Sequence, residues 1–287
     1  MVIGQLLLHD ASRYEQNAAL IDREVMAGLL PVHFWRSVDE STITDQLNNP
    51  LPFDRWASEL RTLGVSLLHI YGEAMPVAAL KQLAIPYISP TPPKKSSFGW
   101  NKARQPAALT RPWGETPIPE AVHPRFLLAP GPRASRSPIR IGTYEGSRHS
   151  IKLICEQTYL RLERFRDDLE WELFENPPDV ADFASLDVWV DPAEEDDLDG
   201  MVLEALATLT PVVAARTTIN SLRLDEGRAG FLVPRDPNEL THAIASALFR
   251  HDQSSEKAIH AASRRLQFSP TQRSSALLAL YRRITDA

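Results

Sequence analysis

Apolar runs of strand length alternate with helical patterns through the first third of the chain. The runs lie at residues 2–8, 30–35, 65–72 and 85–90, and continuous runs of this kind are typical of strands buried on both faces. Residues 17–29, 53–64 and 76–84 have helical patterns, and Gly64 is suited to end the second of them. This succession predicts a parallel sheet with right-handed crossovers.

The composition of the chain changes between Pro86 and Pro138, where 12 of the 23 prolines lie. Proline removes a backbone donor and fixes φ, so such a stretch cannot hold long helices. We interpret it as ordered loop followed by an interdomain linker, with the hinge at Ala129–Pro138.

After the linker the strand–helix rhythm begins again. Strand patterns lie at residues 139–144, 169–175, 187–192, 211–215 and 230–234, and helical patterns at 150–165, 180–186, 200–209, 236–249 and 271–284. We therefore predict an α/β fold with two Rossmann-like, open parallel-sheet domains and a cleft between them. The predicted domains are residues 1–130 and 131–270, and residues 271–287 form a C-terminal helix that could pack back towards the first domain.

Composition excludes several classes of function. The net charge of -6 leaves no basic field for nucleic acid. The 12 glycines form no GxGxxG or GxxxxGK[ST] pattern, which argues against a dinucleotide-binding dehydrogenase and against a P-loop nucleotide-binding protein. The eight histidines lack HxxxH spacing, and we expect no metal site.

Cysteine usage and hydropathy bear on location. A single cysteine, Cys155, fits a reducing compartment, and its helical stripe places it in the core rather than at a reactive site. The run at residues 2–8 is too short to span a membrane and lacks the basic flank of a signal peptide. We expect a cytoplasmic protein without a transmembrane segment.

The stretch from Ala181 to Ala215 brings these features together. Asp187 and Pro192 frame a strand, "EALA" begins at Glu204, and "PVVA" begins at Pro211. With "EGRAGFLVP" further on, this order resembles the second domain of family 4 glycosyltransferases, which have the GT-B fold. The resemblance implies that residues 131–270 bind a nucleotide-sugar and that residues 1–130 form the acceptor side.

The resemblance also assigns site residues. It implies that Glu204 contacts the ribose and that Asp196, eight residues earlier, contacts the donor sugar, because carboxylates hold hydroxyl groups by charge-assisted hydrogen bonds. Gly142 and Arg148 match a loop that reaches the diphosphate. Two other interpretations stay open: helix capping for the acidic residues, and a solvated loop position for Arg148.

Other positions depart from the family pattern. Thr143 and His149 replace an arginine and a glycine, "DDLD" at residues 196–199 replaces a glycine-containing turn, and "HDASRYEQ" replaces a glycine-rich loop after the first strand. His69, at a strand end, fits a ligand contact or a buried, hydrogen-bonded position.

Two hypotheses follow. The first is an enzyme that transfers a sugar from a nucleotide-sugar, its donor substrate, to an unknown acceptor; the family resemblance implies retained anomeric configuration and no bound metal or other cofactor. The second is a catalytically degenerate homologue that acts as a binding or scaffold subunit, with a protein partner or as a homo-oligomer.

Overall fold

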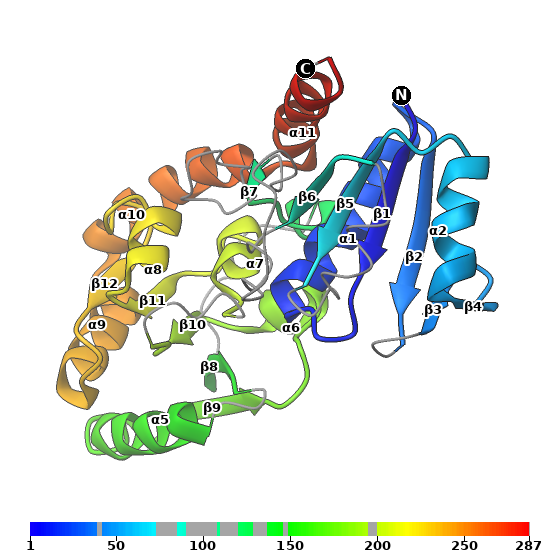
Figure 1. Cartoon of the computed structure of the whole chain (residues 1–287). Coiled ribbons are helices and arrows are strands. Elements are labelled where there is room, and N and C mark those ends of the chain that lie inside the picture. Colours follow the sequence, from blue (N-terminus) through cyan, green and yellow to red (C-terminus); the bar gives the residue numbers. More distant parts are fainter. Residues whose placement is uncertain are drawn as a thin grey trace, which may run out of the picture. The chain divides into compact units, whose positions relative to one another are not determined.

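A computed structural model describes residues 1–38, 42–72, 85–89, 108–109, 120–128, 137–145, 149–194 and 200–286. The contacts divide the chain into two units, each with its own sheet (Figure 1): Met1–Ala121 with Pro270–Ala287, and Val122–Ser269. The predicted boundary at residue 130, most of the predicted hinge and the predicted helix at 76–84 lie outside the described residues. None of the helices in the described ranges combines the length and apolar character needed to cross a membrane.

The first unit is built on a sheet with the strand order β4-β3-β2-β1-β5-β6-β7. The predicted parallel arrangement holds for the four predicted strands, β1 (Ile3–Leu7), β2 (Val32–Ser37), β5 (Leu67–Tyr71) and β6 (Tyr87–Ser89). A further parallel strand, β7 (Ala108–Leu109), was not predicted. Ile3 in the centre lies opposite Val32 on one side and Leu67 on the other. The helices α1 (Arg13–Ala27) and α2 (Phe53–Thr62) follow β1 and β4.

An antiparallel hairpin at the edge of this sheet was not predicted. It consists of β3 (Thr42–Thr44) and β4 (Pro50–Pro52), and β3 pairs with β2. The Asp45 carboxylate accepts hydrogen bonds from the Leu47 and Asn49 N–H groups, at 2.8 and 2.9 Å, and so shapes the turn. Strands of three residues are too short to show an alternation, and the prolines of β4 are tolerated because the strand lies at an edge.

Helix α2 ends as the sequence predicts. Gly64 adopts a φ of 67°, its N–H donates to the Arg61 carbonyl at 3.1 Å, and the Val65 N–H donates to the Leu60 carbonyl at 3.0 Å. This is a Schellman motif, in which a left-handed glycine satisfies the last carbonyls of a helix. The ending directs the chain into β5, while Trp56 and Leu60 are buried in the core of the unit.

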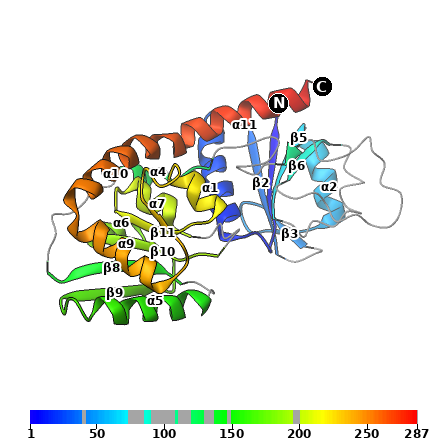
Figure 2. The same ribbon diagram turned by 90° about the vertical axis from the view of Figure 1, so that its left-hand side faces the viewer.

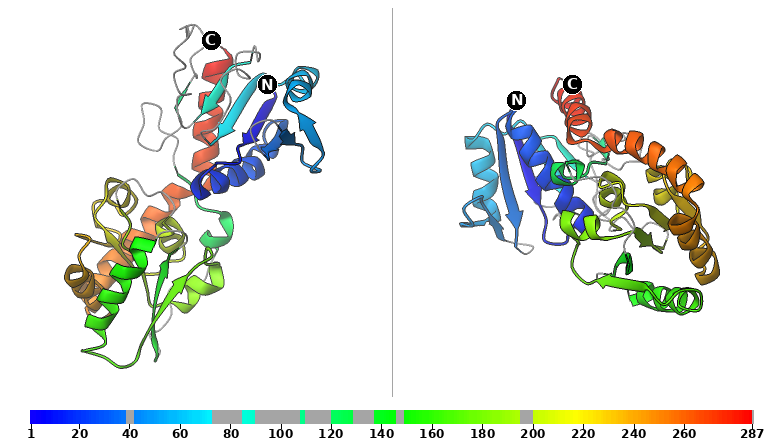
Figure 3. Two further views of the ribbon diagram at one scale, coloured as in Figure 1. Left: turned by 60° about the horizontal axis from the view of Figure 1, so that its bottom comes forward. Right: turned by 180° about the vertical axis from the view of Figure 1, so that it is seen from behind.

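The last helix of the chain, α11 (Pro270–Thr285), belongs to the first unit. It packs against α1 (Figure 3). Its apolar side chains pack with residues of α1 and of the sheet in one core cluster. The buried residues of this cluster are Ile3, Met26, Leu67, Ile88, Leu277, Leu280 and Tyr281. The unit is therefore completed by a segment far from its first part in the sequence.

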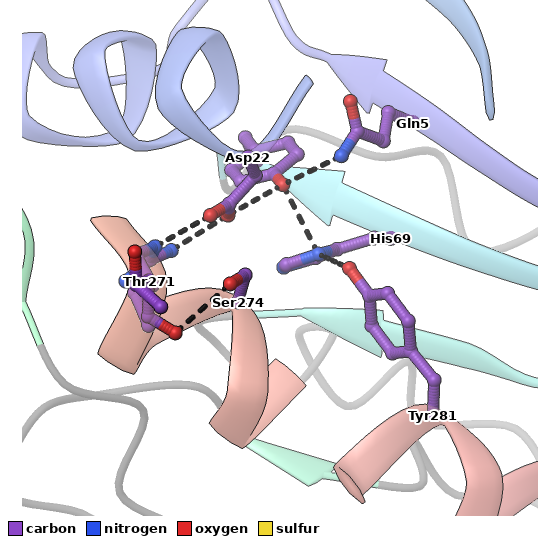
Figure 4. Close-up of polar contacts among 8 residues, drawn as sticks. Gln5, Asp22, His69, Thr271, Ser274 and Tyr281 are labelled. Atoms are coloured by element: carbon purple, nitrogen blue, oxygen red, sulfur yellow. Dashed lines mark hydrogen bonds and ion pairs between the residues drawn. The ribbon is translucent and has the colours of Figure 1, made fainter. Parts of the chain in front are cut away.

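A buried polar cluster fastens α11 to the rest of the first unit (Figure 4). Arg273 of α11 donates from Nε and Nη2 to the two carboxylate oxygens of Asp22 of α1, at 2.6 and 2.8 Å. The Tyr71 hydroxyl donates to the same carboxylate at 2.9 Å. Burial alone would lower the pKa of Arg273, but the adjacent Asp22 charge outweighs that effect and raises it.

His69 lies in the same cluster. Its Nδ1 is 2.7 Å from the Tyr281 hydroxyl and 3.1 Å from the Tyr71 hydroxyl, and the residue is 1% exposed. Burial lowers the pKa of His69 to about 4, although the Asp22 charge opposes the shift. Of the two interpretations of His69, the structure supports the buried, hydrogen-bonded one.

The second unit contains a fully parallel sheet with the strand order β12-β11-β10-β8-β9. All five strand patterns predicted after the linker are confirmed: β8 (Ile139–Tyr144), β9 (Leu169–Phe174), β10 (Val188–Asp191), β11 (Val212–Ala215) and β12 (Phe231–Val233). The helices of the described part are α4 (Pro124–Leu127), α5 (His149–Leu162), α6 (Val180–Ser185), α7 (Val202–Ala207), α8 (Thr218–Arg223), α9 (Pro237–Phe249), α10 (His251–Arg264) and a 3-10 turn (Arg265–Phe268).

Two apolar clusters cover the two faces of this sheet. Side chains of β10 alternate between the two clusters: Val188 and Val190 pack with residues of α5 and α9, whereas Trp189 packs with residues of α6 and α7. The ribbons of these helices around the sheet can be followed in Figure 2. Cys155 of α5 is 2% exposed, which confirms its predicted core position. At the limits of the unit, the Val122 N–H donates to the Phe268 carbonyl at 3.0 Å.

Candidate functional site

The strand order of the second sheet creates a topological switch point at the carboxyl ends of β8 and β10. The chain passes from β8 outwards to β9, then returns to β10 on the other side of β8. Open α/β sheets bind ligands outside the carboxyl ends of their strands at such a point. The connections that leave this edge run from β8 to α5 and from β10 to α7, and they contain the predicted residues Arg148 and Asp196.

Arg148 and Asp196 themselves lie outside the described residues, as does the side chain of His149. Their assignment to the diphosphate and the donor sugar remains a prediction. The other two predicted residues, Gly142 and Glu204, are described.

Asp191, the last residue of β10, fixes the local geometry of the edge. Its carboxylate is buried and accepts a hydrogen bond from Asn220 Nδ2 at 3.1 Å, and the same amide donates to the Ala215 carbonyl at 3.1 Å. A Cβ atom on Gly200 would lie 2.8 Å from Asp191 Oδ2. Glycine is therefore required where the returning chain crosses this carboxylate.

Glu204 lies in the first turn of α7. Its backbone carbonyl accepts the Thr208 N–H at 3.0 Å and the Thr208 hydroxyl at 3.1 Å, whereas its side chain is half-buried. The other five residues of α7 are buried. A carboxylate in a first turn is favoured by the helix dipole, so this position is compatible with both predicted roles, the helix-terminal charge and the ribose contact.

Gly142, in β8, has a packing role. A Cβ atom there would lie 2.3 Å from Leu186 Cδ1 and 3.1 Å from Trp189 Cε3. The absence of a side chain thus lets β8 approach the turn between α6 and β10. This contact explains the glycine without a ligand, and its predicted part in diphosphate binding remains a prediction.

Arg235, which follows β12, was not among the predicted site residues. Its Nε donates to the Pro192 carbonyl at 2.8 Å, and Nη2 donates to the Ser150 carbonyl at 3.3 Å. Nη2 also lies 3.3 Å from the exposed Glu194 carboxylate, and such a pair adds little stability. Arg235 therefore ties the segment after β10 to the start of α5. The available signal was a cation directly after a strand, in "GFLVPRDP".

Comparisons with solved structures identify the fold. A glycosyltransferase from Rickettsia africae aligns with a TM-score of 0.67 at 11% identity, covering 99% of this chain and 98% of that one. A sucrose-phosphate synthase from Thermosynechococcus elongatus gives 0.65 at 14% identity, with 99% of each chain covered. Anabaena HepE in complex with UDP and glucose gives 0.57 at 12% identity, covering 96% and 98%. The protein has the GT-B fold, with two Rossmann-like α/β units.

A family match adds to this assignment. Residues 164–249 match the family described as "Glycosyl transferases group 1". No curated protein sequence matches the chain significantly. The matched segment begins near the end of α5 and extends through α9, so it contains β10, β11 and Glu204. The protein is glycosyltransferase-like, in agreement with the resemblance found in the sequence.

Proposed function

We propose that this protein transfers a sugar from a nucleotide-sugar donor to a hydroxyl-bearing acceptor. The observation that carries the proposal is the match of residues 164–249 to the group 1 glycosyltransferases, because it covers Glu204 and the edge formed by β10 and β11. HepE, one of the similar structures, contains UDP and glucose. UDP-sugars are therefore the first donors to test.

The reaction breaks the bond between the anomeric carbon and the diphosphate and forms a bond from that carbon to the acceptor oxygen. The acceptor's hydroxyl proton leaves to the diphosphate or to solvent. In the proposal, the carboxylate of Glu204 accepts hydrogen bonds from the ribose and Asp196 holds the donor sugar. Arg148, in the connection that follows β8, stabilises the negative charge that grows on the departing diphosphate.

The described residues contribute positioning. Arg235 holds the Pro192 segment against the start of α5, and the Asp191 carboxylate lies against Gly200. These contacts lie at the described ends of the two connections, and in the proposal they lower the ordering cost of binding. The proposal includes anomeric retention, no bound metal or other cofactor, and a cytoplasmic location, the last supported by the single cysteine.

A thermal-shift panel of nucleotide-sugars tests the proposal. A donor at about 100 times its Kd stabilises the folded state by about 2.7 kcal/mol, which corresponds to several degrees in Tm. We expect one nucleotide series to raise Tm in the wild type and to lose this effect in Glu204→Ala. Release of free nucleotide from the active donor, with water as the acceptor, should fall in parallel.

Glu256→Ala provides the matched control, since Glu256 is an exposed helical glutamate on α10. It should keep the full nucleotide response. A wild type whose Tm responds to none of the donors would overturn the proposal, and equal responses in the two variants would remove Glu204 from the site.

A second candidate function is a binding or scaffold subunit without catalysis. The observations in its favour are the departures from the family pattern: Thr143 replaces an arginine, and the acidic stretch at residues 196–199 replaces a glycine-containing turn, so negative charge stands where a diphosphate would bind. A stable complex with a second copy or a partner, measured by light scattering, together with no nucleotide response, would support this function instead.

A further inference from the structure

A recess opens on the surface of the second unit, away from the candidate site. It has a volume of about 650 Å³ and lies between the C-terminal parts of α5 and α9 and the start of β9. Leu162, Leu169 and Leu248 line it with apolar side chains. Because Leu169 is the first residue of β9, the recess lies at the amino ends of the parallel strands, whereas the candidate site lies at their carboxyl ends.

Two exposed aromatic side chains line the same recess. Phe165 is 78% exposed and Phe249 is 43% exposed. No other phenylalanine side chain in the described part of the chain is exposed. Exposed aromatic side chains that gather at one recess are typical of a protein interface, because aromatic residues and arginine are enriched at interface cores.

Arg166 lies at the recess with its charge already compensated. Its Cζ is 5.0 Å from the centroid of the Phe249 ring. Nε and Nη2 donate to the two carboxylate oxygens of Asp168, at 2.7 and 2.6 Å. The stacked ring and the paired carboxylate hold the guanidinium in one orientation, so a surface that covers it meets a flat and neutral pair.

The charges around the recess are balanced as well. The segment 161–168 has three cations, Arg161, Arg164 and Arg166, and three anions, Glu163, Asp167 and Asp168. An anionic membrane attracts surfaces with an excess of lysine and arginine, and a strongly charged partner requires a surface of the opposite sign. A balanced surface meets neither condition. It suits an identical surface, because charges of one sign can meet their opposites in the second copy.

We propose that the recess is the centre of a two-fold interface between two copies of this chain. Phe165 stands at the rim of the recess, so the protruding side chain and the hollow that receives it belong to one surface, as a self-complementary interface requires. Beside a two-fold axis at this rim, Phe165 of each copy packs into the recess of the other, and Phe249 is covered. The interface leaves the carboxyl ends of the strands open and does not depend on the proposed function.

Sedimentation velocity of the 287-residue chain tests the proposal. We expect reversible dimers and no larger species, with a Kd on the order of 10 μM because a few aromatic side chains anchor the interface. Phe165→Asp should raise this Kd by about thirtyfold or more, since it removes an anchor and places a carboxylate in an apolar recess. The position is exposed in the single chain, so urea denaturation should show unchanged stability of the monomeric variant.

Ile259→Asp is the matched control, because Ile259 on α10 is 72% exposed and does not line the recess. It should leave the dimer intact. A wild type that stays monomeric at about 200 μM would overturn the proposal, as would a dimer that Phe165→Asp does not weaken. A monomeric wild type that floats with vesicles of phosphatidylcholine and phosphatidylserine would assign the recess to a membrane surface instead.

Discussion

The two units share the order of their parallel strands but use charged groups differently. In the first unit, Asp22 and Arg273 form a buried pair between α1 and α11, beside the sheet residue His69. In the second unit, Asp191 and Arg235 lie at and beyond strand ends, where they hold connecting segments. In the same topology, a charged pair thus fixes a helix in the first unit, and charged side chains support the proposed ligand-binding edge in the second.

The switch points show the same contrast in sign. A carboxylate, Glu15, joins the segments at the switch point of the first unit, whereas a guanidinium, Arg235, joins the corresponding segments of the second. Arg235 also pairs with the exposed Glu194 carboxylate, so the contrast concerns the group that joins the segments and not the net charge of the edge.

Loss of the buried Asp22–Arg273 pair should cause the largest loss of stability in either unit. Arg273→Met leaves the Asp22 charge buried without its partner, and we expect the free energy of unfolding of the first unit to fall by about 3–5 kcal/mol. Urea denaturation measures the change. Arg282→Met, at an exposed position on the same helix, should change it by less than about 0.5 kcal/mol. Similar losses in the two variants would contradict the fastening role.

The pH dependence of stability should be the next largest effect. Burial lowers the folded-state pKa of His69 from 6.5 to about 4, so the unfolded state binds a proton more readily. The free energy of unfolding should therefore fall by roughly 3 kcal/mol as the pH drops from 6.5 to about 4, and level off below that pH. The contribution is fully present above pH 6.5. Urea denaturation from pH 7 to 4 measures it.

His69→Gln is the comparison for that measurement. The variant removes the titrating group, so the difference between the two curves isolates His69 from the carboxylates that titrate in the same range. If both proteins lose the same stability between pH 7 and 4, the buried histidine does not control this dependence.

Gly142→Ala should have a smaller effect on stability, and it tests the packing role of Gly142 in the second unit. The new methyl group would overlap Leu186 and press on Trp189, which should cost about 1–3 kcal/mol in thermal unfolding. Gly28→Ala is the control, because the nearest atom to a Cβ there is 3.9 Å away. Unchanged stability with weakened nucleotide binding would instead favour the diphosphate role of Gly142.

Strands β1, β2, β5, β6 and β8 to β12 could be predicted because most are rich in apolar residues, whereas β3, β4 and β7, of two or three residues each, were missed. Helix α10 was missed, since its sequence "HDQSSEKAIHAASR" has few apolar residues and its Ile259 is 72% exposed. Helix α8 was missed as well, and its six residues are too few to show a periodicity. Local pattern therefore identifies elements whose apolar residues recur regularly, but not a largely polar helix or one shorter than two turns.

The candidate site was only partly accessible to sequence reasoning. Glu204 and the β10–α7 connection could be found because the surrounding residues follow a family order. Arg235 could not, because its partners Pro192 and Ser150 are 43 and 85 residues away in the sequence. The Asp22–Arg273 pair spans 251 residues, and nothing near either residue distinguishes it from a solvated charge on a helix.

The hydrogen bond between Val122 and Phe268 has a practical consequence for dissecting this protein. Because the chain enters and leaves the second unit at neighbouring points, residues 122–269 form an insertion with paired ends. Domains of this kind are suited to excision and transplantation. The first unit, by contrast, would have to be rebuilt by splicing its final helix to residues 1–121 through a short artificial linker.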